Sequence, residues 1–96
     1  RLLSSRVLNS GANVALADNR MRVAEAEFAF KLGSDLPPRE RPYSMQEVVD
    51  AAASLHPAIE LPDSRFADFT VVGGAQLAAD NACTHWFVLG PPSDAD

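Results

Sequence analysis

The sequence predicts an α+β fold that is mainly β. Three runs rich in branched and aromatic residues are typical of strands: 22–32, 58–61 and 84–89. One further run carries apolar residues at helical spacing and predicts a single amphipathic helix. Turn-forming residues separate these runs. Because helix content is low, we expect an α+β or mainly β arrangement and not a doubly wound sheet.

The strand expected over residues 22–32 carries two carboxylates in an otherwise apolar run. Successive strand side chains point to opposite faces, so Glu25 and Glu27 would share one face. The other face is apolar throughout and should be buried. It would hold Ala24, Ala26, Phe28, Phe30 and Leu32.

The amphipathic helix is expected from Met45 to about Leu55. Ser44 is a good N-cap, and Glu47 three residues later completes a capping box. The helix should stop at His56-Pro57, because the residue before a proline avoids the helical region. Its buried stripe would consist of Met45, Val48, Val49, Ala52 and Leu55.

Two shorter segments have weaker patterns. Residues 1–8 fit either a short strand or one helical turn, and residues 75–79 fit one or two helical turns. His56 and His85 are expected to be structural, since neither has the partners of a metal or catalytic site. Asp63 and Arg65 are expected to pair with each other in a loop, and contact with substrate is the alternative.

Composition limits the classes of partner. The chain has 96 residues, enough for one small domain, and a net charge of -5 with scattered basic residues, which argues against a nucleic-acid-binding face. No apolar run approaches the roughly 20 residues of a membrane span. Cys83 is the only cysteine, so no disulfide within the chain and no cysteine zinc site is expected. We expect a cytoplasmic protein.

A third carboxylate, Glu60, follows the expected helix. A strand-helix-strand unit can bring its two strands side by side, which would place Glu60 near Glu25 and Glu27. Oxygen-only ligands suit Mg²⁺ or Mn²⁺, and open positions on such an ion could take a chelating 2-oxo acid. The alternative is a solvated strand face with ordinary acids, which a Glu-x-Glu pattern alone favours.

Five stretches match, in order, the pattern of one superfamily: residues 23–37, 56–60, 63–66, 79–82 and 87–91. With these stretches the chain resembles the fumarylacetoacetate hydrolase superfamily, most closely its 2-keto-4-pentenoate hydratase and 4-oxalocrotonate decarboxylase branch. The resemblance implies a mixed β-sandwich roll with a Mg²⁺ or Mn²⁺ site at its open end. It also implies that residues 1–96 are the central piece of a single catalytic domain.

The resemblance assigns site residues as well. Glu25, Glu27 and Glu60 take the places of the family's metal ligands, and Asp80 and Asn81 match a motif near the substrate pocket. The Lys and Asp of proton transfer in the hydratase branch lie outside this chain, so the catalytic residues are not assigned and the piece alone should be inactive. The single lysine, Lys31, is expected on a solvated face.

The implied activity is that of a divalent-metal lyase. It would hydrate or decarboxylate a small unsaturated 2-oxo acid, as in aromatic catabolism, and the full-length protein is expected to be a homo-oligomer. One alternative is a metal-dependent hydrolase that cleaves a C–C bond of an acylpyruvate with the same ligands. Another is a non-catalytic family member or fragment.

Overall fold

The computed structural model describes residues 1–93 and contains one four-stranded mixed sheet. The strands are β1 (Val7–Asn9), β2 (Glu25–Leu32), β3 (Ala52–Leu61) and β4 (Trp86–Leu89), in the order β1-β4-β3-β2. β1 is parallel to β4, and the other pairs are antiparallel. The fold is therefore α+β and mainly β, as predicted.

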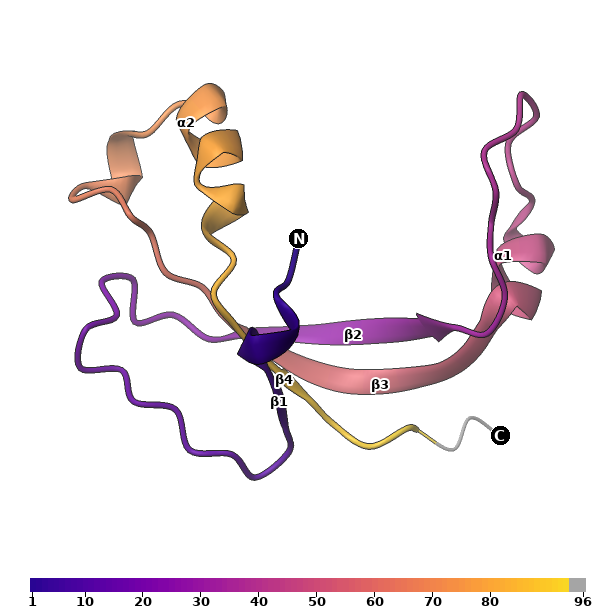
Figure 1. The fold of residues 1–96 in the computed structure, drawn as a ribbon, viewed down its shortest axis with the longest axis horizontal. Helices are drawn as coiled ribbons and strands as arrows, with labels where there is room; N and C mark the ends of the chain where they lie inside the picture. The colour runs from indigo at the N-terminus through magenta and orange to yellow at the C-terminus, as the bar shows by residue number, and fades with distance from the viewer. Residues whose placement is uncertain (94–96) are drawn as a thin grey trace.

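The helices are short and lie at the two ends of the sheet. Figure 1 shows β2 and β3 as a long curved bridge, with α1 (Met45–Ala51) at one end and α2 (Gly74–Ala79) at the other. Three 3₁₀ turns complete the described elements: Ser4–Arg6, Phe69–Val71 and Asn81–Cys83. No helix among the described residues has the length and apolar character needed to cross a bilayer.

The first segment of the chain contains both of the elements between which the sequence left a choice. A 3₁₀ turn over Ser4–Arg6 leads directly into β1. Arg6 from this turn lies over the ring of Trp86 on β4, with its guanidinium carbon 4.3 Å from the ring centroid. A cation over an aromatic face is attractive, so this contact holds the first turn against the sheet.

β2 and β3 are joined through α1 and pair along almost their whole length. The antiparallel register sets Glu25 opposite Glu60, Glu27 opposite Ala58, and Lys31 opposite Ser54. The predicted adjacency of the two strands on either side of the helix is therefore confirmed. This register decides which side chains can meet, because directly opposed residues share one face of the sheet.

The helix prediction was right at its start and wrong at its end. The capping box is present: Glu47 N donates to Ser44 Oγ, and Ser44 N donates to the Glu47 carboxylate. The helix stops at Ala51, however, because Ala52 turns extended and the following residues pair with β2. A helix of two turns is marginal by itself, and the ladder with β2 satisfies more backbone groups.

The sequence predicted that His56-Pro57 would end the helix. Pro57 instead lies inside β3. Its carbonyl accepts a hydrogen bond from Gly90 N, 2.8 Å away, just beyond the end of β4. In an antiparallel strand the N–H and C=O of one residue point to the same side. The missing proline N–H therefore falls where the β4 ladder has already ended, and costs no strand pairing.

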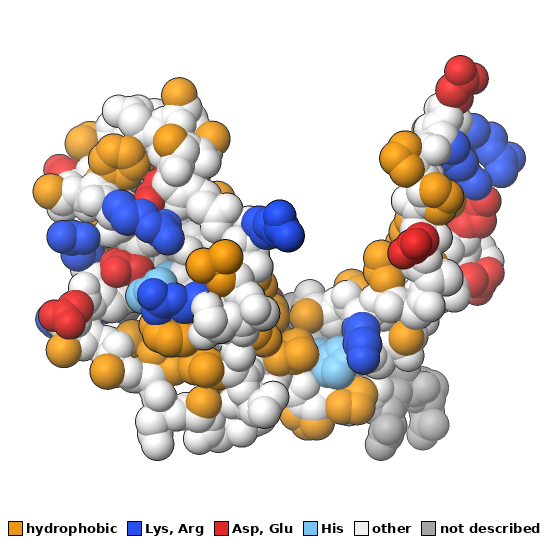
Figure 2. Space-filling view, viewed as in Figure 1, with side chains coloured by type: hydrophobic (Ala, Val, Ile, Leu, Met, Phe, Trp, Pro, Cys, Tyr) orange, Lys and Arg blue, Asp and Glu red, His pale blue; other side chains and the backbone are white. Residues whose placement is uncertain are grey.

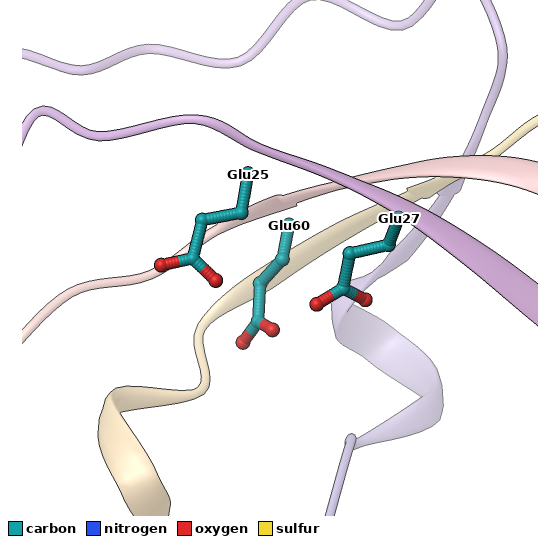
Figure 3. A group of neighbouring side chains, drawn as sticks. All are labelled: Glu25, Glu27 and Glu60. Atoms are coloured by element: carbon teal, nitrogen blue, oxygen red, sulfur yellow. The ribbon is translucent and has the colours of Figure 1, made fainter.

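The apolar face of β2 was predicted to be buried, and this was wrong. Phe28 is 76% exposed and Phe30 66%, and Leu32 is exposed too, whereas Glu27 on the opposite face is half-buried. The helical turns near the carboxylates lie on the side toward which the three glutamates point (Figure 3). Within residues 1–93 the chain thus covers the carboxylate face and leaves the phenylalanine face open.

The predicted buried stripe of α1 is also wrong. Met45 is 85% exposed, and Val48 and Val49 are exposed, while Ala51 alone in the helix is buried. Figure 1 shows that α1 stands beyond the end of the sheet, and the described element that it contacts most is the adjoining β3. The helix is amphipathic in pattern, but its apolar stripe is exposed to solvent in the described chain.

Polar contacts stabilise the start of α1 and the loop before it. Arg39 donates to both oxygens of the Glu47 carboxylate at 2.9 and 2.8 Å, and lies 3.5 Å from the centroid of the Tyr43 ring. The Arg39 hydrogen bond, together with the capping contacts of Ser44, lowers the pKa of Glu47 to about 2. The helix start is therefore fixed by charge and capping rather than by burial.

Candidate metal centre

Glu25, Glu27 and Glu60 form one cluster at the β2–β3 pair. Each offers a carboxylate oxygen, and these three oxygens lie within 4.8 Å of one another. Figure 3 shows the three side chains on one side of the sheet, with their carboxylates turned toward a common space. The predicted meeting of the three acids is confirmed in geometry.

The sequence produces this cluster through strand alternation and register. Glu25 and Glu27 are two residues apart on β2 and share a face. Glu60 lies directly opposite Glu25 on β3, so its side chain enters the same face. Opposed like charges destabilise a sheet, which makes this placement unfavourable unless something compensates for it.

The electrostatics follow from that crowding. Burial raises the pKa of the Glu60 carboxyl, and the charges of Glu27 and Glu25 raise it further. A hydrogen bond from the Thr84 side chain opposes the shift. The negative form of Glu60 is thus held among two other carboxylates, a setting that a divalent cation would relieve.

The donor set fits a hard divalent ion. All three ligands are carboxylate oxygens, which suit Mg²⁺ or Mn²⁺, and three protein ligands would leave positions for water or a chelating substrate. Glu25 is exposed, and the other two are half-buried, so the space between them is open to solvent. Exposed acids also gather without a metal, and the geometry by itself does not identify an ion.

Asp80 and Asn81 follow α2 and are not part of the triad of Glu25, Glu27 and Glu60. Asp80 is buried and bound by Arg65, whose Nη1 donates to Oδ1 at 3.0 Å, and by Ser64 Oγ at 3.1 Å. Burial raises the pKa of Asp80, but the hydrogen bonds from Arg65 and Ser64 together lower it below its usual range. Asn81 is exposed and accepts from the Arg1 backbone nitrogen.

The predicted pairing of Asp63 with Arg65 was wrong, because Arg65 pairs with Asp80. Asp63 instead accepts from the backbone N–H of Arg20 at 2.8 Å. The spacing of two residues in the loop sends the two side chains to different partners. Arg65 therefore ties the loop after β3 to the end of α2.

The residues after Asp80 have an unusual backbone. Asn81, Ala82 and Cys83 have φ values of 53°, 52° and 52°, in the left-handed region. Such a conformation costs roughly 1–2 kcal/mol for each residue that carries a Cβ. It is held by hydrogen bonds such as Asp63 N to Cys83 O, 2.9 Å. This turn places Thr84 where its side chain bonds to Glu60.

The two histidines differ in how their ring nitrogens are satisfied. His56 is buried, with Nε2 2.8 Å from Ser54 Oγ and Nδ1 2.9 Å from the Gly90 carbonyl. This is the structural role predicted for it. His85 is different: its Nδ1 is buried and has no hydrogen-bond partner among the described residues.

Sequence reasoning missed one feature near the triad. Residues from four separate segments line a cleft of about 260 Å³, and half of the chain's eight basic residues are among them. Because these arginines are scattered along the sequence, only the fold reveals that they converge. Thr84, which contacts Glu60, also lines this cleft.

Comparison with known proteins does not identify the chain. No protein-family model matches the sequence, and no curated protein matches it. The likeness to the fumarylacetoacetate hydrolase superfamily therefore rests on the motifs quoted above.

Proposed function

We propose that the protein is part of a divalent-metal-dependent lyase that hydrates or decarboxylates a small unsaturated 2-oxo acid. The observation that carries the proposal is the meeting of three carboxylate oxygens within 4.8 Å. These acids come from two strands and are brought together by register, although their mutual repulsion opposes it. A bound Mg²⁺ or Mn²⁺ would offset that repulsion.

The roles within the triad differ. Glu25 and Glu27 come from neighbouring positions of one strand, and Glu60 closes the site from the other. Burial is the first cause of the raised pKa of Glu60. When bound, the ion would supply a Lewis acid for the carbonyl and carboxylate oxygens of a 2-oxo acid.

The single lysine does not supply the proton-transfer group. Lys31 lies four positions after Glu27, the nearer ligand on β2, which corresponds to about 13 Å along a strand. A general base must lie within hydrogen-bond reach of the proton it takes, directly or through one water. We therefore do not assign Lys31 as the acid-base group of the proposed reaction.

That position of Lys31 also favours a second candidate, a non-catalytic family member that keeps the carboxylates without the proton-transfer machinery. A metal-dependent C–C hydrolase of the acylpyruvate type would use the same three ligands. Metal binding is common to the lyase and the hydrolase, so it is the property to test first.

Calorimetric titration with Mn²⁺ tests the proposal. We expect saturable one-site binding to the protein and its loss in Glu25→Gln, with circular dichroism as the folding control. Glu40→Gln is the matched control, since it makes the same change at an exposed acid outside the triad. A folded protein that binds no Mn²⁺, or one whose binding survives Glu25→Gln and Glu60→Gln, would overturn the metal site.

A further inference from the structure

The cleft beside the triad is strongly basic. Its lining includes four arginines and one acid, Asp63, together with several uncharged polar groups. The complete lining is Arg1, Leu3, Arg6, Arg20, Asp63, Ser64, Arg65, Asn81, Thr84 and His85. In a chain of net charge -5, this concentration of positive charge in one cleft is the opposite of the whole-molecule balance.

Not all of this charge is free. Arg65 forms an ion pair with the buried Asp80, so its charge is largely compensated inside the protein. The guanidinium groups of Arg1, Arg6 and Arg20 form no ion pair with a carboxylate among the described residues. Three uncompensated cations therefore face a single carboxylate, that of Asp63. Figure 2 shows basic side chains gathered at the end of the molecule that carries α2.

The arginines are held in place before any ligand arrives. Arg6 lies over the Trp86 ring at 4.3 Å, and Arg20 Nη1 donates to the Ser64 carbonyl at 3.2 Å. These contacts use part of each guanidinium group and leave other N–H donors available. Preorganised planar donors of this kind bind carboxylate and phosphate oxygens well.

His85 lines the same cleft but does not present its buried nitrogen to it. Its Nδ1 is buried, lacks a partner among the described residues, and belongs to a side chain that lines the cleft. An unsatisfied buried polar atom is unfavourable, but an anion in the open cleft does not reach this nitrogen, because it is shielded from solvent. Burial lowers the pKa of His85, and the charge of Arg6 lowers it further, so both effects favour the neutral ring.

We propose that this cleft is a binding site for a small oxyanion, either phosphate or the carboxylate of a small organic acid. Arg6 and Arg20 would supply the charged donors. A cleft of about 260 Å³ lies just below the roughly 300–1,000 Å³ typical of pockets for drug-sized ligands, and suits a compact anion. Its proposed donors are not the three carboxylates, although Thr84 both lines the cleft and bonds to Glu60.

The test is calorimetric titration with inorganic phosphate and, separately, succinate, each against chloride at matched ionic strength. We expect one-site binding of at least one anion and roughly tenfold weaker binding in Arg20→Gln, since a charge-assisted hydrogen bond is lost. Arg6→Gln should weaken binding similarly. Arg41→Gln is the matched control, because Arg41 is an exposed arginine on the distant arm beside α1.

The outcomes separate the sources and the two sites. Binding of phosphate alone or of succinate alone assigns the anion, and binding of both assigns a general oxyanion site. Glu25→Gln should keep anion binding even where it abolishes Mn²⁺ binding. No binding of either anion by the folded protein overturns the proposal, as does equal weakening in Arg20→Gln and Arg41→Gln. If Arg6→Gln fails to fold, Arg20→Gln alone decides.

Discussion

Glu60 is the residue at which backbone pairing and electrostatics conflict most directly. The register of β2 and β3 sets it opposite Glu25, and two further effects, burial and the charge of Glu27, disfavour its ionised form. The hydrophobic residues beside it keep this arrangement in place: Ile59 and Leu61 pair with Val88 and Trp86 on β4. The fold therefore holds Glu60 directly opposite another carboxylate, a pairing that is unfavourable in a sheet.

We expect Glu60→Gln to stabilise the metal-free protein near pH 7 by about 0.2–1 kcal/mol, the cost of like charges directly opposed in a sheet. The folded-state pKa of Glu60 lies above its unfolded value, so the folded protein binds more protons between these two values. The contribution of Glu60 to the free energy of unfolding is therefore greatest below the unfolded pKa and is lost as pH rises through the folded pKa.

Urea unfolding of both proteins at several pH values near and above 4.5 would measure this effect. The variant should lack the fall in stability that the original shows over this window. Addition of Mn²⁺ should reverse the order of stability at neutral pH, because only the original keeps all three ligands. A variant that is less stable than the original without metal would contradict the account of repulsion.

At the scale of the elements, α1 shows what a helix does when its apolar stripe has no partner. Its start is fixed by the Ser44–Glu47 capping box and by Arg39, and its end by the strand pairing that begins at Ala52. The exposed Met45 shows that burial contributes little to it. Stability of this helix is therefore local, and it can open without the sheet.

We expect Ser44→Ala to destabilise α1 by about 1 kcal/mol, the usual cost of losing an N-cap. The effect should appear in hydrogen exchange of the Val48 amide, which donates to the Ser44 carbonyl at 3.2 Å, and not in the β2–β3 ladder. Ser34→Ala is a control at an exposed serine in the loop before the helix. Equal loss of protection in the ladder would mean that the helix and sheet unfold together.

The sequence was sufficient for features that depend on local rules. Strand alternation placed Glu25 and Glu27 on one face, and the capping box located the first turn of α1 correctly. It was insufficient wherever tertiary pairing overrides a local preference. Pro57 has a strong local preference against helix, but the strand that contains it starts five residues earlier, at Ala52. Local patterns do not show where a neighbouring ladder begins.

The candidate site divides in the same way. The three carboxylates could be predicted, because a helix between two strands allows those strands to be neighbours. The arginine cleft could not be predicted, since Arg6, Arg20 and Arg65 lie in three segments whose convergence depends on the loops between strands. Charge periodicity gives no signal for such a cluster. Only the positions of the loops reveal it.

At the scale of the whole molecule, the described chain has very little core. Apart from proline, the buried apolar residues among those described are Ala51 and Ala58. Phe28 and Phe30 on β2 are exposed. β2 is also an edge strand, so its outer backbone groups are unpaired within the sheet. Edge strands and large exposed apolar faces both promote association.

We therefore expect the protein to self-associate, with sedimentation velocity giving a mass above the 10.3 kDa of one chain and rising with concentration. Burial of one phenylalanine contributes about 1.5–3 kcal/mol, so the double variant Phe28→Ser, Phe30→Ser should shift the equilibrium strongly toward the single chain. Val71→Ser is the control, because Val71 is 77% exposed and lies in a 3₁₀ turn outside the sheet. A cooperatively folded protein that stays monomeric at high concentration would show that the open face of β2 is stable in water, and the expected homo-oligomer would then have to use another surface.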